Sequence, residues 1–550
     1  MAERRITPVA AVAAAMGAVA QPVVRHAPRR LLYALAAVTG FLSISQETLW
    51  IKVIGSANDN RPETFAHALG CFLLGLAFGA LWGRGLQRRW RLGNLRFVAV
   101  MVALSGAVFY LSMPLGAAVL TRDDSLGRLV FFVATALTSA AMGGILPLLC
   151  EAAAAEGLDA GAATSRVLLA NVLGSAAGPL VTGYVLLEVE TLEHNILLVA
   201  LAAFGLAQLL WFLAPERQRR LGMTAFALAA LTALTVQPTL FRLFLEKVHF
   251  GSEGYEPGYQ YVAQGRAGIV GVWPNGHEYG EGLYDGGFNL DPVSNTNLIN
   301  RAFFVPALHR APRRVLEIGL GTGSWARILA DLPTLDSLTI VEIDPAYVDV
   351  MWHYPEIASV LSDPRVRLRF DDGRRWLARH PRAAFDVIVI NGTWHWRSGA
   401  THILSAEFLR ELKMHLNPDG VAYFNTTGSY DVLYTAAGAF RHVIRVSNFV
   451  AASDAPFDQT PAERRAAMLG IRGPDGKPRI RGDSASATLE QFLSAASEEL
   501  APQLRRANDL WNITDDNMAT EFKANGAGSW WRALPARVWR PDRAWPTILF

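Results

Sequence analysis

The stretch Val315–Gly323 constrains the fold of this chain more than any other. It reads Val-Leu-Glu-Ile-Gly-Leu-Gly-Thr-Gly, so an apolar run ends in a glycine-rich turn, and a helix-forming run follows directly. The glycines are Gly319, Gly321 and Gly323. A second apolar run ends at Glu342 and Asp344, about 20 residues further on, the spacing at which an acid can bind ribose hydroxyls. The pattern predicts a nucleoside-binding, doubly wound α/β domain; the alternative is a tight turn in an ordinary α/β domain.

The C-terminal half alternates between strand-like and helix-like runs. This alternation predicts a parallel sheet covered by helices on both faces. The predicted strands lie at 314–318, 338–343, 366–370, 385–391 and 420–425, and the predicted helices at 324–332, 346–361, 373–379 and 405–416. Before them, Tyr259 to Trp273 is typical of a β-hairpin, and a second short strand pair is expected around Tyr279 to Phe288.

The N-terminal half is far more apolar. The chain is 51% hydrophobic overall, and nearly all of the apolar excess precedes residue 241. A helix needs about 20 apolar residues to cross a bilayer, and seven stretches are long enough. The predicted spans are 31–54, 63–83, 95–120, 128–150, 165–187, 194–214 and 222–241. We therefore predict a helical bundle surrounded by lipid in a bacterial-type cytoplasmic (inner) membrane.

These patterns divide the 550 residues into four parts. Residues 1–30 form an alanine-rich leader that is only weakly hydrophobic, and we expect it to be disordered or interfacial. Residues 31–241 form the membrane bundle, 250–300 a small β subdomain, and 301–550 the nucleoside-binding domain with a C-terminal extension. The tryptophans of that extension suit an interfacial belt or packing on the domain: Trp530, Trp531, Trp539 and Trp545.

Arginines are distributed unevenly between the loops of the predicted bundle. One alternate set of loops holds most of them: Arg4, Arg5, Arg25, Arg29, Arg30, Arg84, Arg88, Arg89, Arg91, Arg217, Arg219 and Arg220. The positive-inside rule therefore places the N-terminus in the cytoplasm. Seven spans would then place the C-terminal domain outside, away from the cytosolic nucleotide pool. The alternatives are a seventh segment that lies in the interface or a leader that also crosses; the arginine asymmetry favours the extracytoplasmic placement.

Polar and small residues inside the predicted spans point to function and to packing. Glu47 is ionisable and lies in a span, which makes it a functional candidate; the alternative is a position near the helix end or a hydrogen bond within the bundle. Glycines four residues apart let helices approach closely, which predicts tight packing and a homo-oligomer formed through these faces. The glycines are Gly75, Gly79, Gly83, Gly174 and Gly178.

Two further features exclude classes of ligand. Cys71 and Cys150 both fall in predicted spans, so we expect small buried hydrophobic residues instead of a disulfide or a metal site. The net charge of the chain is only +3, which gives no indication of nucleic acid binding.

Several acids follow the carboxyl ends of the predicted parallel strands, where open α/β sheets bind ligands. They are Glu317, Glu342, Asp344, Asp371 and Asp372. We expect Glu342 to bind the ribose and Asp372 the adenine amino group, with exposed strand-end carboxylates as the alternative. Asp386 begins its strand at the opposite edge and is expected to be structural.

The chain resembles the fused membrane proteins that join a major-facilitator-like helical region to a spermidine synthase domain. The motifs that carry the resemblance are Gly40–Trp50, Leu73–Gly79, Gly143–Pro147, Asn171–Gly178, Tyr259-Gln260, the glycine turn, Val341–Asp344, Asp371–Gly373 and Ile513–Phe522. The resemblance implies a polyamine aminopropyltransferase-type domain that takes S-adenosylmethionine or its decarboxylated form as a substrate and needs no metal. It further implies Gln260 on the nucleoside side of the site and Tyr259 on the substrate side.

Three positions depart from that family. Its acids bind the cationic amine acceptor and take its proton; one lies inside the glycine turn, where this chain has Thr322, and two follow the fourth strand, where it has Asn391 and Trp394. An amide is no general base, and threonine cannot pair with an ammonium group. His395 beside them could replace the base or bind an apolar or anionic acceptor. The alternative is that the tryptophans pack against the membrane half and the histidines are solvated.

Three functions of different classes remain. The first is a membrane-anchored transferase with an altered acceptor site, for which Asn391 and His395 are the catalytic candidates. The second is a catalytically degenerate nucleoside-binding domain that regulates or scaffolds the bundle. The third is a transporter-like bundle for which the C-terminal domain is a sensor. The retained ribose and adenine positions favour ligand binding over a dead fold, and the missing acids favour a changed acceptor over polyamine synthesis. Few charges lie within the predicted spans, which weakens transport, so the first function is our prediction; the sequence does not identify the small-molecule acceptor.

Overall fold

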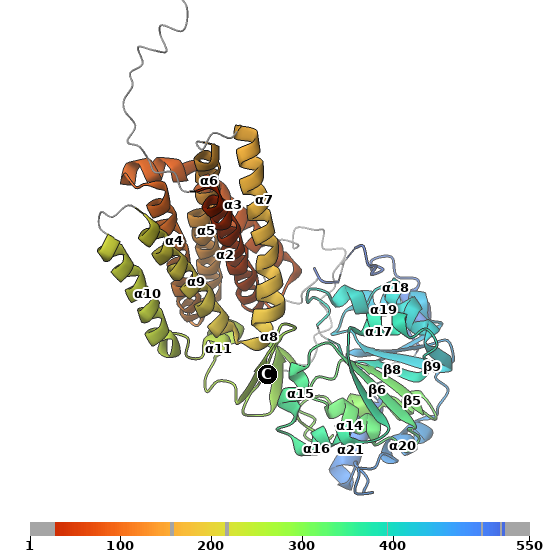
Figure 1. The fold of residues 1–550 in the computed structure, drawn as a ribbon. Coiled ribbons are helices and arrows are strands. Elements are labelled where there is room, and N and C mark those ends of the chain that lie inside the picture. The colour runs from red at the N-terminus through yellow and green to blue at the C-terminus, as the bar shows by residue number, and fades with distance from the viewer. Residues whose placement is uncertain are drawn as a thin grey trace, which may run out of the picture.

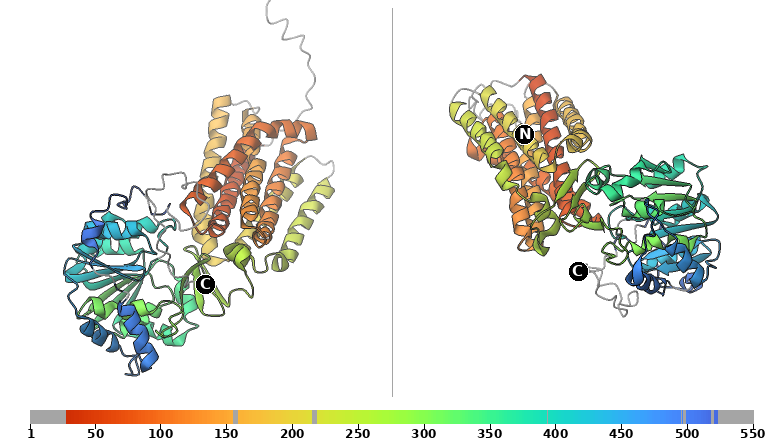
Figure 2. Two further views of the ribbon diagram at one scale, coloured as in Figure 1. Left: turned by 180° about the vertical axis from the view of Figure 1, so that it is seen from behind. Right: turned by 90° about the horizontal axis from the view of Figure 1, so that it is seen from below.

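The computed structural model describes residues 28–154, 159–214, 219–392, 394–494, 496, 499–517 and 520–522. Most of the predicted leader, Thr393 and the tryptophan-rich C-terminal extension lie outside the described residues. The described chain forms a helical bundle, a four-stranded sheet and a seven-stranded sheet flanked by helices (Figure 1). Two further views show the small sheet between the bundle and the large sheet (Figure 2).

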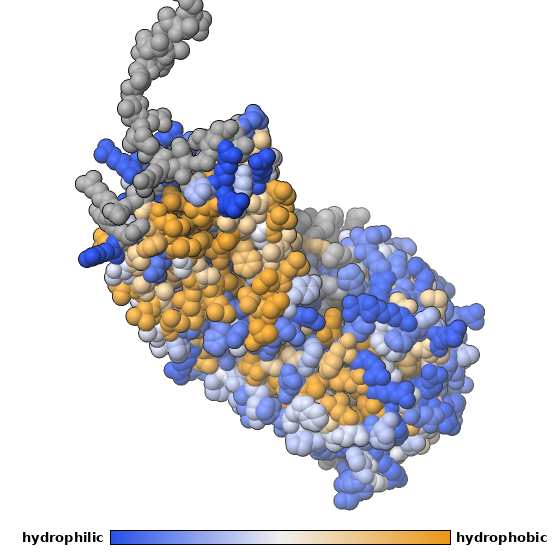
Figure 3. Space-filling model, viewed as in Figure 1, coloured by the Kyte–Doolittle hydropathy of each residue, from blue (hydrophilic) through white to orange (hydrophobic). Residues whose placement is uncertain are grey.

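The bundle contains the helices α2 (Arg29–Ser56), α3 (Pro62–Trp90), α4 (Asn94–Leu120), α5 (Asp124–Gly143), α6 (Ile145–Ala154), α7 (Ala160–Val181), α8 (Leu187–Val189), α9 (Leu192–Leu213) and α10 (Arg219–Leu240). Two of the long helices, α5 and α7, are continued by the shorter α6 and α8. Among the described residues, six stretches are long and apolar enough to cross a membrane: Pro62–Trp90, Asn94–Leu120, Asp124–Ala154, Gly161–Val189, Leu192–Leu213 and Arg220–Leu240. Figure 3 shows the apolar band across one face of the bundle.

Seven spans were predicted, but α2, which corresponds to the first of them, is not among these six. This helix carries the polar run 43–48, and it contacts α3, α5, α6, α7 and α9. Its polar side chains bond inside the bundle: the Ser105 hydroxyl donates to Gln46 at 2.8 Å, and the Thr182 hydroxyl donates to Ser45 at 2.9 Å. A central helix can therefore be long without the apolarity of its neighbours. Glu47 is half-buried on it, and its functional role stays a prediction.

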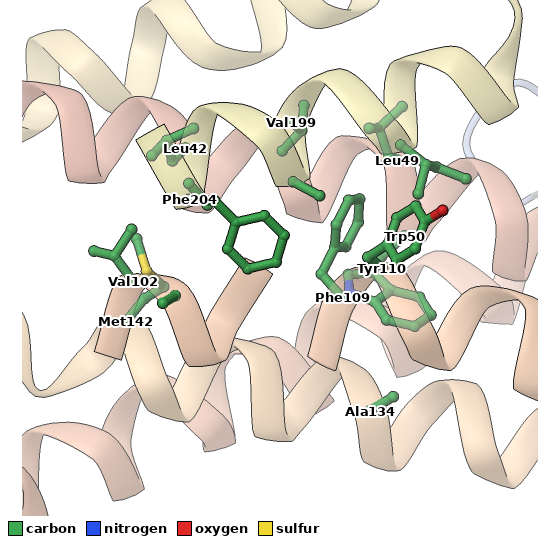
Figure 4. Close-up of a cluster of buried hydrophobic side chains, with 14 of the residues drawn as sticks. Leu42, Leu49, Trp50, Val102, Phe109, Tyr110, Ala134, Met142, Val199 and Phe204 are labelled. Carbon is green, nitrogen blue, oxygen red and sulfur yellow. The ribbon is translucent and has the colours of Figure 1, made fainter. Parts of the chain in front are cut away.

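Aromatic rings fill the core of the bundle (Figure 4). The Trp50 ring meets Phe109 and Phe131 edge-on, with centroids 5.9 and 6.0 Å apart. All three side chains are fully buried, a burial worth roughly 2–3 kcal/mol for each large apolar side chain. The C-terminal half of α2 is therefore rigidly held, which matters because the polar end of this helix reaches the small sheet.

The glycines predicted to pack helices do so within this chain. A Cβ atom on Gly174 would lie 1.8 Å from the Ala37 carbonyl oxygen, and one on Gly79 would lie 2.0 Å from that of Ala140. Helix α7 thus packs directly on α2, and α3 on α5. The predicted homo-oligomer stays a prediction, but these faces are already occupied within the chain.

The small sheet contains β1 (Tyr261–Gln264), β2 (Ile269–Val272), β3 (His277–Gly280) and β4 (Leu283–Gly287), all antiparallel and in sequential order. A hairpin and a separate strand pair were expected here; instead β2 also pairs with β3, so the four strands form one sheet. Helix α11 (Phe244–Phe250) connects the bundle to this sheet. The sheet is thus built where it can touch both the bundle and the C-terminal domain.

The large sheet has the strand order β10-β11-β9-β8-β5-β6-β7. Strands β5 (Arg314–Ile318), β6 (Ser337–Glu342), β7 (Val366–Phe370), β8 (Phe385–Ile390) and β9 (Leu416–Asn425) are parallel, as predicted. Strands β10 (His442–Val446) and β11 (Phe449–Ser453) were not predicted; they pair antiparallel with each other, and β11 with β9, and make the sheet mixed.

Helices cover both faces of this sheet, each over its own apolar cluster. On one face lie α12 (Asn300–Phe303), α13 (Val305–Leu308), α14 (Ser324–Ala330), α20 (Pro461–Leu469) and α21 (Gly482–Ser494). On the other lie α17 (Gly373–Arg379), α18 (Ala406–Met414), α19 (Tyr430–Ala439) and α22 (Ala501–Leu504). The single helix predicted at 346–361 is divided into α15 (Ala346–Met351) and α16 (Pro355–Ala358), because a proline disfavours helical geometry in the residue before it.

Candidate functional site

The glycine turn joins β5 to α14 with three left-handed residues. Gly319, Gly321 and Gly323 have φ angles of +87°, +50° and +75°, a conformation that side chains with a Cβ rarely adopt. The turn also lies against other parts of the chain, since a Cβ on Gly319 would be 3.5 Å from the Asn391 carbonyl oxygen. The backbone can therefore pass close to a ligand at the carboxyl edge of the parallel strands.

Glu342 lies at the end of β6, beside this turn. Its carboxylate accepts hydrogen bonds from the backbone N–H groups of Leu320 at 2.6 Å and Asp344 at 2.9 Å. Burial raises the pKa of Glu342 to about 7, although these two hydrogen bonds act to lower it. The acid predicted to bind ribose is thus fixed in position by the turn, before any ligand binds.

Glu317, on β5, is the second acid that the sequence placed at this edge. Its side chain is fully buried, and neither carboxyl oxygen has a hydrogen-bond partner. Burial, and after it the nearby Glu342 carboxylate, hold the pKa of Glu317 well above its ordinary value. Burial thus favours the protonated form of Glu317, which can donate a hydrogen bond.

The end of β7 brings Asp371 and Asp372 to the same edge, where the Asp371 N–H donates to the Glu342 carbonyl oxygen at 3.0 Å. The Asp371 carboxylate accepts from Arg375 and Arg379, which makes it an ion-pair partner within the fold. The Asp372 carboxylate accepts from the Arg375 N–H at 2.8 Å and caps α17. Only one Asp372 oxygen is used in this way, so its predicted contact with the adenine amino group remains compatible with the cap.

The predicted acceptor side is made of groups that bond within the fold. The Thr322 hydroxyl donates to Ser324 at 2.9 Å, and the Trp394 indole N–H donates to the Tyr284 carbonyl oxygen at 3.2 Å. His395 is buried, and its ring Nδ1 lies 2.5 Å from the Thr427 hydroxyl oxygen. These contacts position the loop after β8 against the glycine turn and the small sheet, close to the half-buried Asn391.

The same loop contacts the bundle. The Ser398 N–H donates to the Asn60 carbonyl oxygen at 3.0 Å, and the Arg61 guanidinium lies 5.6 Å from the centre of the Trp396 ring. Trp396 therefore packs against the helical bundle, as the alternative interpretation predicted for the tryptophans of this loop. The acceptor side of the candidate site therefore lies next to the loop between α2 and α3.

Tyr259 and Gln260 directly precede the first strand of the small sheet, and their side chains bond to residues other than those of the glycine turn. The Tyr259 hydroxyl is 2.8 Å from His249 Nδ1, and its ring packs with those of Phe250 and Trp273. Gln260 is exposed, and its side chain donates to the Tyr261 hydroxyl at 3.2 Å. The roles that the family resemblance implies for these two residues stay predictions, without a contact to Glu342 or the glycines.

Two acids near the turn were missed by the sequence reasoning. Glu278, on β3, is fully buried, and a Cβ on Gly321 would lie 3.6 Å from its Oε2 atom. Asp285, on β4, accepts from the Tyr347 hydroxyl at 2.5 Å and lies 3.9 Å from the Arg397 guanidinium. The sequence could have indicated these residues as acids at inward-facing positions of short strands. Their contact with the turn, however, arises only in the folded chain.

An ion pair ties the small sheet to the bundle. Lys52, near the end of α2, contacts the Glu281 carboxylate, which also accepts from the Ser56 hydroxyl at 2.8 Å and the Ile269 N–H at 3.1 Å. Burial acts to raise the pKa of Glu281, but Lys52 outweighs it, and the pKa lies below its ordinary value. A charged contact therefore joins a bundle helix to the sheet that carries Glu278 and Asp285.

Comparison with known proteins identifies the C-terminal domain. The family model for the spermine/spermidine synthase domain matches residues 302–436. The polyamine aminopropyltransferase of Moorella thermoacetica is 39% identical over 140 residues, which cover 24% of this chain and 49% of that protein. The polyamine aminopropyltransferase of Desulforudis audaxviator is 30% identical over 166 residues, which cover 28% of this chain and 60% of that protein. This chain thus spans about half the length of the relatives it matches.

A solved spermidine synthase from Thermotoga maritima aligns with 36% of this chain and 73% of its own, at 20% identity and a TM-score of 0.31. The family match lies outside the helical bundle, so the resemblance of the bundle to major facilitator helices stays a prediction. In the part of the chain that the structure describes, no cluster of His, Cys, Asp and Glu side chains could hold a metal ion. Residues 302–436 of this chain are thus similar to the spermine/spermidine synthase domain, and the relatives that match the chain include polyamine aminopropyltransferases.

Proposed function

We propose that this chain is a membrane-anchored, spermidine synthase-like transferase that binds S-adenosylmethionine or decarboxylated S-adenosylmethionine at the glycine turn. The observation that carries the proposal is the Glu342 carboxylate, which two backbone N–H groups hold beside three left-handed glycines. A carboxylate fixed in this way can accept hydrogen bonds from ribose hydroxyls without first reorganising. The match to polyamine aminopropyltransferases supports the same reaction class.

The acceptor site of the proposed transferase differs from the polyamine type. Thr322, Asn391 and Trp394 stand where the family has amine-binding acids, and the hydroxyl and the indole already bond within the fold. Asn391 and His395 are the proposed catalytic residues of the altered site. His395 is buried against Thr427, so a role as base requires a proton path through this loop. The acceptor remains a small molecule of unidentified class.

A second candidate function is nucleoside sensing for the bundle, without catalysis. The contact between Lys52 and Glu281 favours it, because it links a bundle helix directly to the sheet beside the site. The two functions predict different products from the same bound nucleoside. Consumption of S-adenosylmethionine or its decarboxylated form by the purified protein, with methylthioadenosine or another adenosyl product released, is expected only for the transferase.

We expect Glu342→Gln and Asp372→Ala each to weaken nucleoside binding at least tenfold. Each substitution removes a charge-assisted hydrogen bond, worth roughly 1.5–3 kcal/mol. Calorimetric titration of the full-length protein in detergent measures the affinities. Thr460→Ala is the matched control, because it removes the cap of α20 as Asp372→Ala removes that of α17, but far from the turn. Unchanged affinity in both site variants would show that the nucleoside binds elsewhere.

We propose further that α2 also crosses the membrane, as a central helix surrounded by other helices of the bundle, and that the C-terminal domain lies outside the cytoplasm. The C-terminal end of α2 contacts the small sheet, whereas Arg29 and Arg30 begin this helix and Arg88 and Arg89 end the following one. These arginines therefore lie at the end of the bundle opposite the domain. Alkaline phosphatase fused after Phe550 is expected to be active; a fluorescent cytosolic fusion at the same position would instead place the domain inside.

A further inference from the structure

Glu278 is a buried acid that the fold leaves without a partner. Its side chain is fully buried on β3, and neither carboxyl oxygen has a hydrogen-bond partner. The carboxyl group faces the glycine turn, since a Cβ on Gly321 would lie 3.6 Å from Oε2. A buried polar group without a hydrogen bond is costly, so its retention calls for a partner that arrives with a ligand.

Other carboxyl groups surround the same space. Asp285 and Glu342 are close enough to Glu278 that, after burial itself, their charges hold its pKa well above the ordinary value. Glu317 adds a fourth buried carboxyl group next to Glu342. Among the ion pairs of the described residues, the one that reaches this cluster joins the Arg397 guanidinium to Asp285 at 3.9 Å. The four carboxyl groups carry more potential negative charge than this ion pair balances.

The small sheet also reaches the position at which the turn lacks an acid. A Cβ on Gly286 would lie 3.4 Å from the Thr322 methyl group, so β4 packs directly on that residue. Strands β3 and β4 thus bring Glu278 and Asp285 to the turn from a different part of the chain. Carboxyl groups that are absent from the sequence of the turn are present in its surroundings.

We propose that Glu278, together with Asp285, binds the positively charged group of the nucleoside ligand above the glycine turn. This inference rests on the proposed function, because it assigns the part of that same site next to the ribose. The cation is an alkylammonium or a sulfonium group, both of which decarboxylated S-adenosylmethionine carries and methylthioadenosine lacks. Its binding would supply the partner that both buried carboxyl oxygens of Glu278 lack.

The first test needs no variant. Full-length protein in detergent is titrated calorimetrically with decarboxylated S-adenosylmethionine and with methylthioadenosine. We expect the cationic nucleoside to bind at least tenfold more tightly than the neutral one. Equal affinity for the two nucleosides would overturn the assignment of a cation site while leaving the proposed function intact. Binding of neither nucleoside would contradict the proposed function itself.

The second test uses Glu278→Gln, which keeps the shape and removes the charge. We expect this variant to lose at least tenfold in affinity for decarboxylated S-adenosylmethionine and to bind methylthioadenosine as the parent does. Its melting temperature should be equal or higher, because an unpaired buried acid has been replaced. Glu253→Gln, an exposed acid just before the same sheet, is the matched control and should change neither affinity. Parallel losses for both nucleosides in Glu278→Gln would contradict the proposal.

A free amine could supply the same charge, and a third titration distinguishes this source. Putrescine is added to the protein saturated with methylthioadenosine. If putrescine binds more strongly when methylthioadenosine is present than when it is absent, and Glu278→Gln abolishes this gain, the cation belongs to a separate amine. The absence of any putrescine effect, together with a preference for the cationic nucleoside, assigns it to the nucleoside. If the affinity for the amine and the affinity for the cationic nucleoside are both unchanged in Glu278→Gln, the proposed cation site is wrong.

Discussion

Replacing Lys52 by methionine is expected to destabilise the folded protein by about 3–5 kcal/mol, the cost of removing one partner from a buried ion pair. The Glu281 carboxylate would remain buried, with the Ser56 hydroxyl and the Ile269 N–H as its neutral partners. Burial acts to raise the pKa of Glu281 and Lys52 acts to lower it, so without Lys52 the buried acid must either stay charged without a cation partner or take up a proton, and both are unfavourable. Thermal unfolding of the full-length protein in detergent should show a melting temperature lower by several degrees.

Two controls separate this effect from the loss of any lysine. Lys477→Met removes an exposed ion pair with Asp475, and its expected cost is below about 1 kcal/mol. The double variant Lys52→Met, Glu281→Gln should recover most of the lost stability, because it removes the buried charge as well. If Lys52→Met were no more destabilising than Lys477→Met, the contact between α2 and the small sheet would not stabilise the fold as described.

The second large effect is expected from Gly174→Ala. The new Cβ atom would lie 1.8 Å from the Ala37 carbonyl oxygen, so α7 must move away from α2. Forcing extra volume into a packed interface costs typically 1–3 kcal/mol and occasionally more. The melting temperature in detergent should fall accordingly. Gly183→Ala is the matched control in the same candidate span, where a Cβ meets nothing within 4 Å; similar melting temperatures for the two variants would contradict the close packing.

Local patterns in the sequence were sufficient to predict that the glycine turn and Glu342 lie side by side. The turn at Gly319–Gly323 requires left-handed backbone, and the acid at Glu342 follows an apolar strand, so spacing alone predicted their meeting. The five parallel strands followed from the alternation of strand and helix. Strands β10 and β11 extend the sheet antiparallel beyond this regular alternation, which therefore did not predict them.

The charge of the site could not be predicted in the same way. The sequence shows Thr322, Asn391 and Trp394 at positions where acids were expected, and this pointed to an acceptor side without carboxylates. Glu278 and Asp285 reach the turn only because the small sheet folds onto it, a contact between segments that share no local pattern. Likewise, α2 was predicted as a lipid-spanning helix like its neighbours, whereas its polar groups are bonded within the bundle.

The central claim is that an adenosyl nucleoside binds at the glycine turn of the C-terminal domain. Calorimetric titration of the full-length protein with S-adenosylmethionine, decarboxylated S-adenosylmethionine and methylthioadenosine tests it most directly. The account predicts saturable binding of at least the decarboxylated form, reduced at least tenfold by Glu342→Gln, since that substitution removes a charge-assisted hydrogen bond. Folded protein that binds none of the three nucleosides at millimolar concentration would contradict the account.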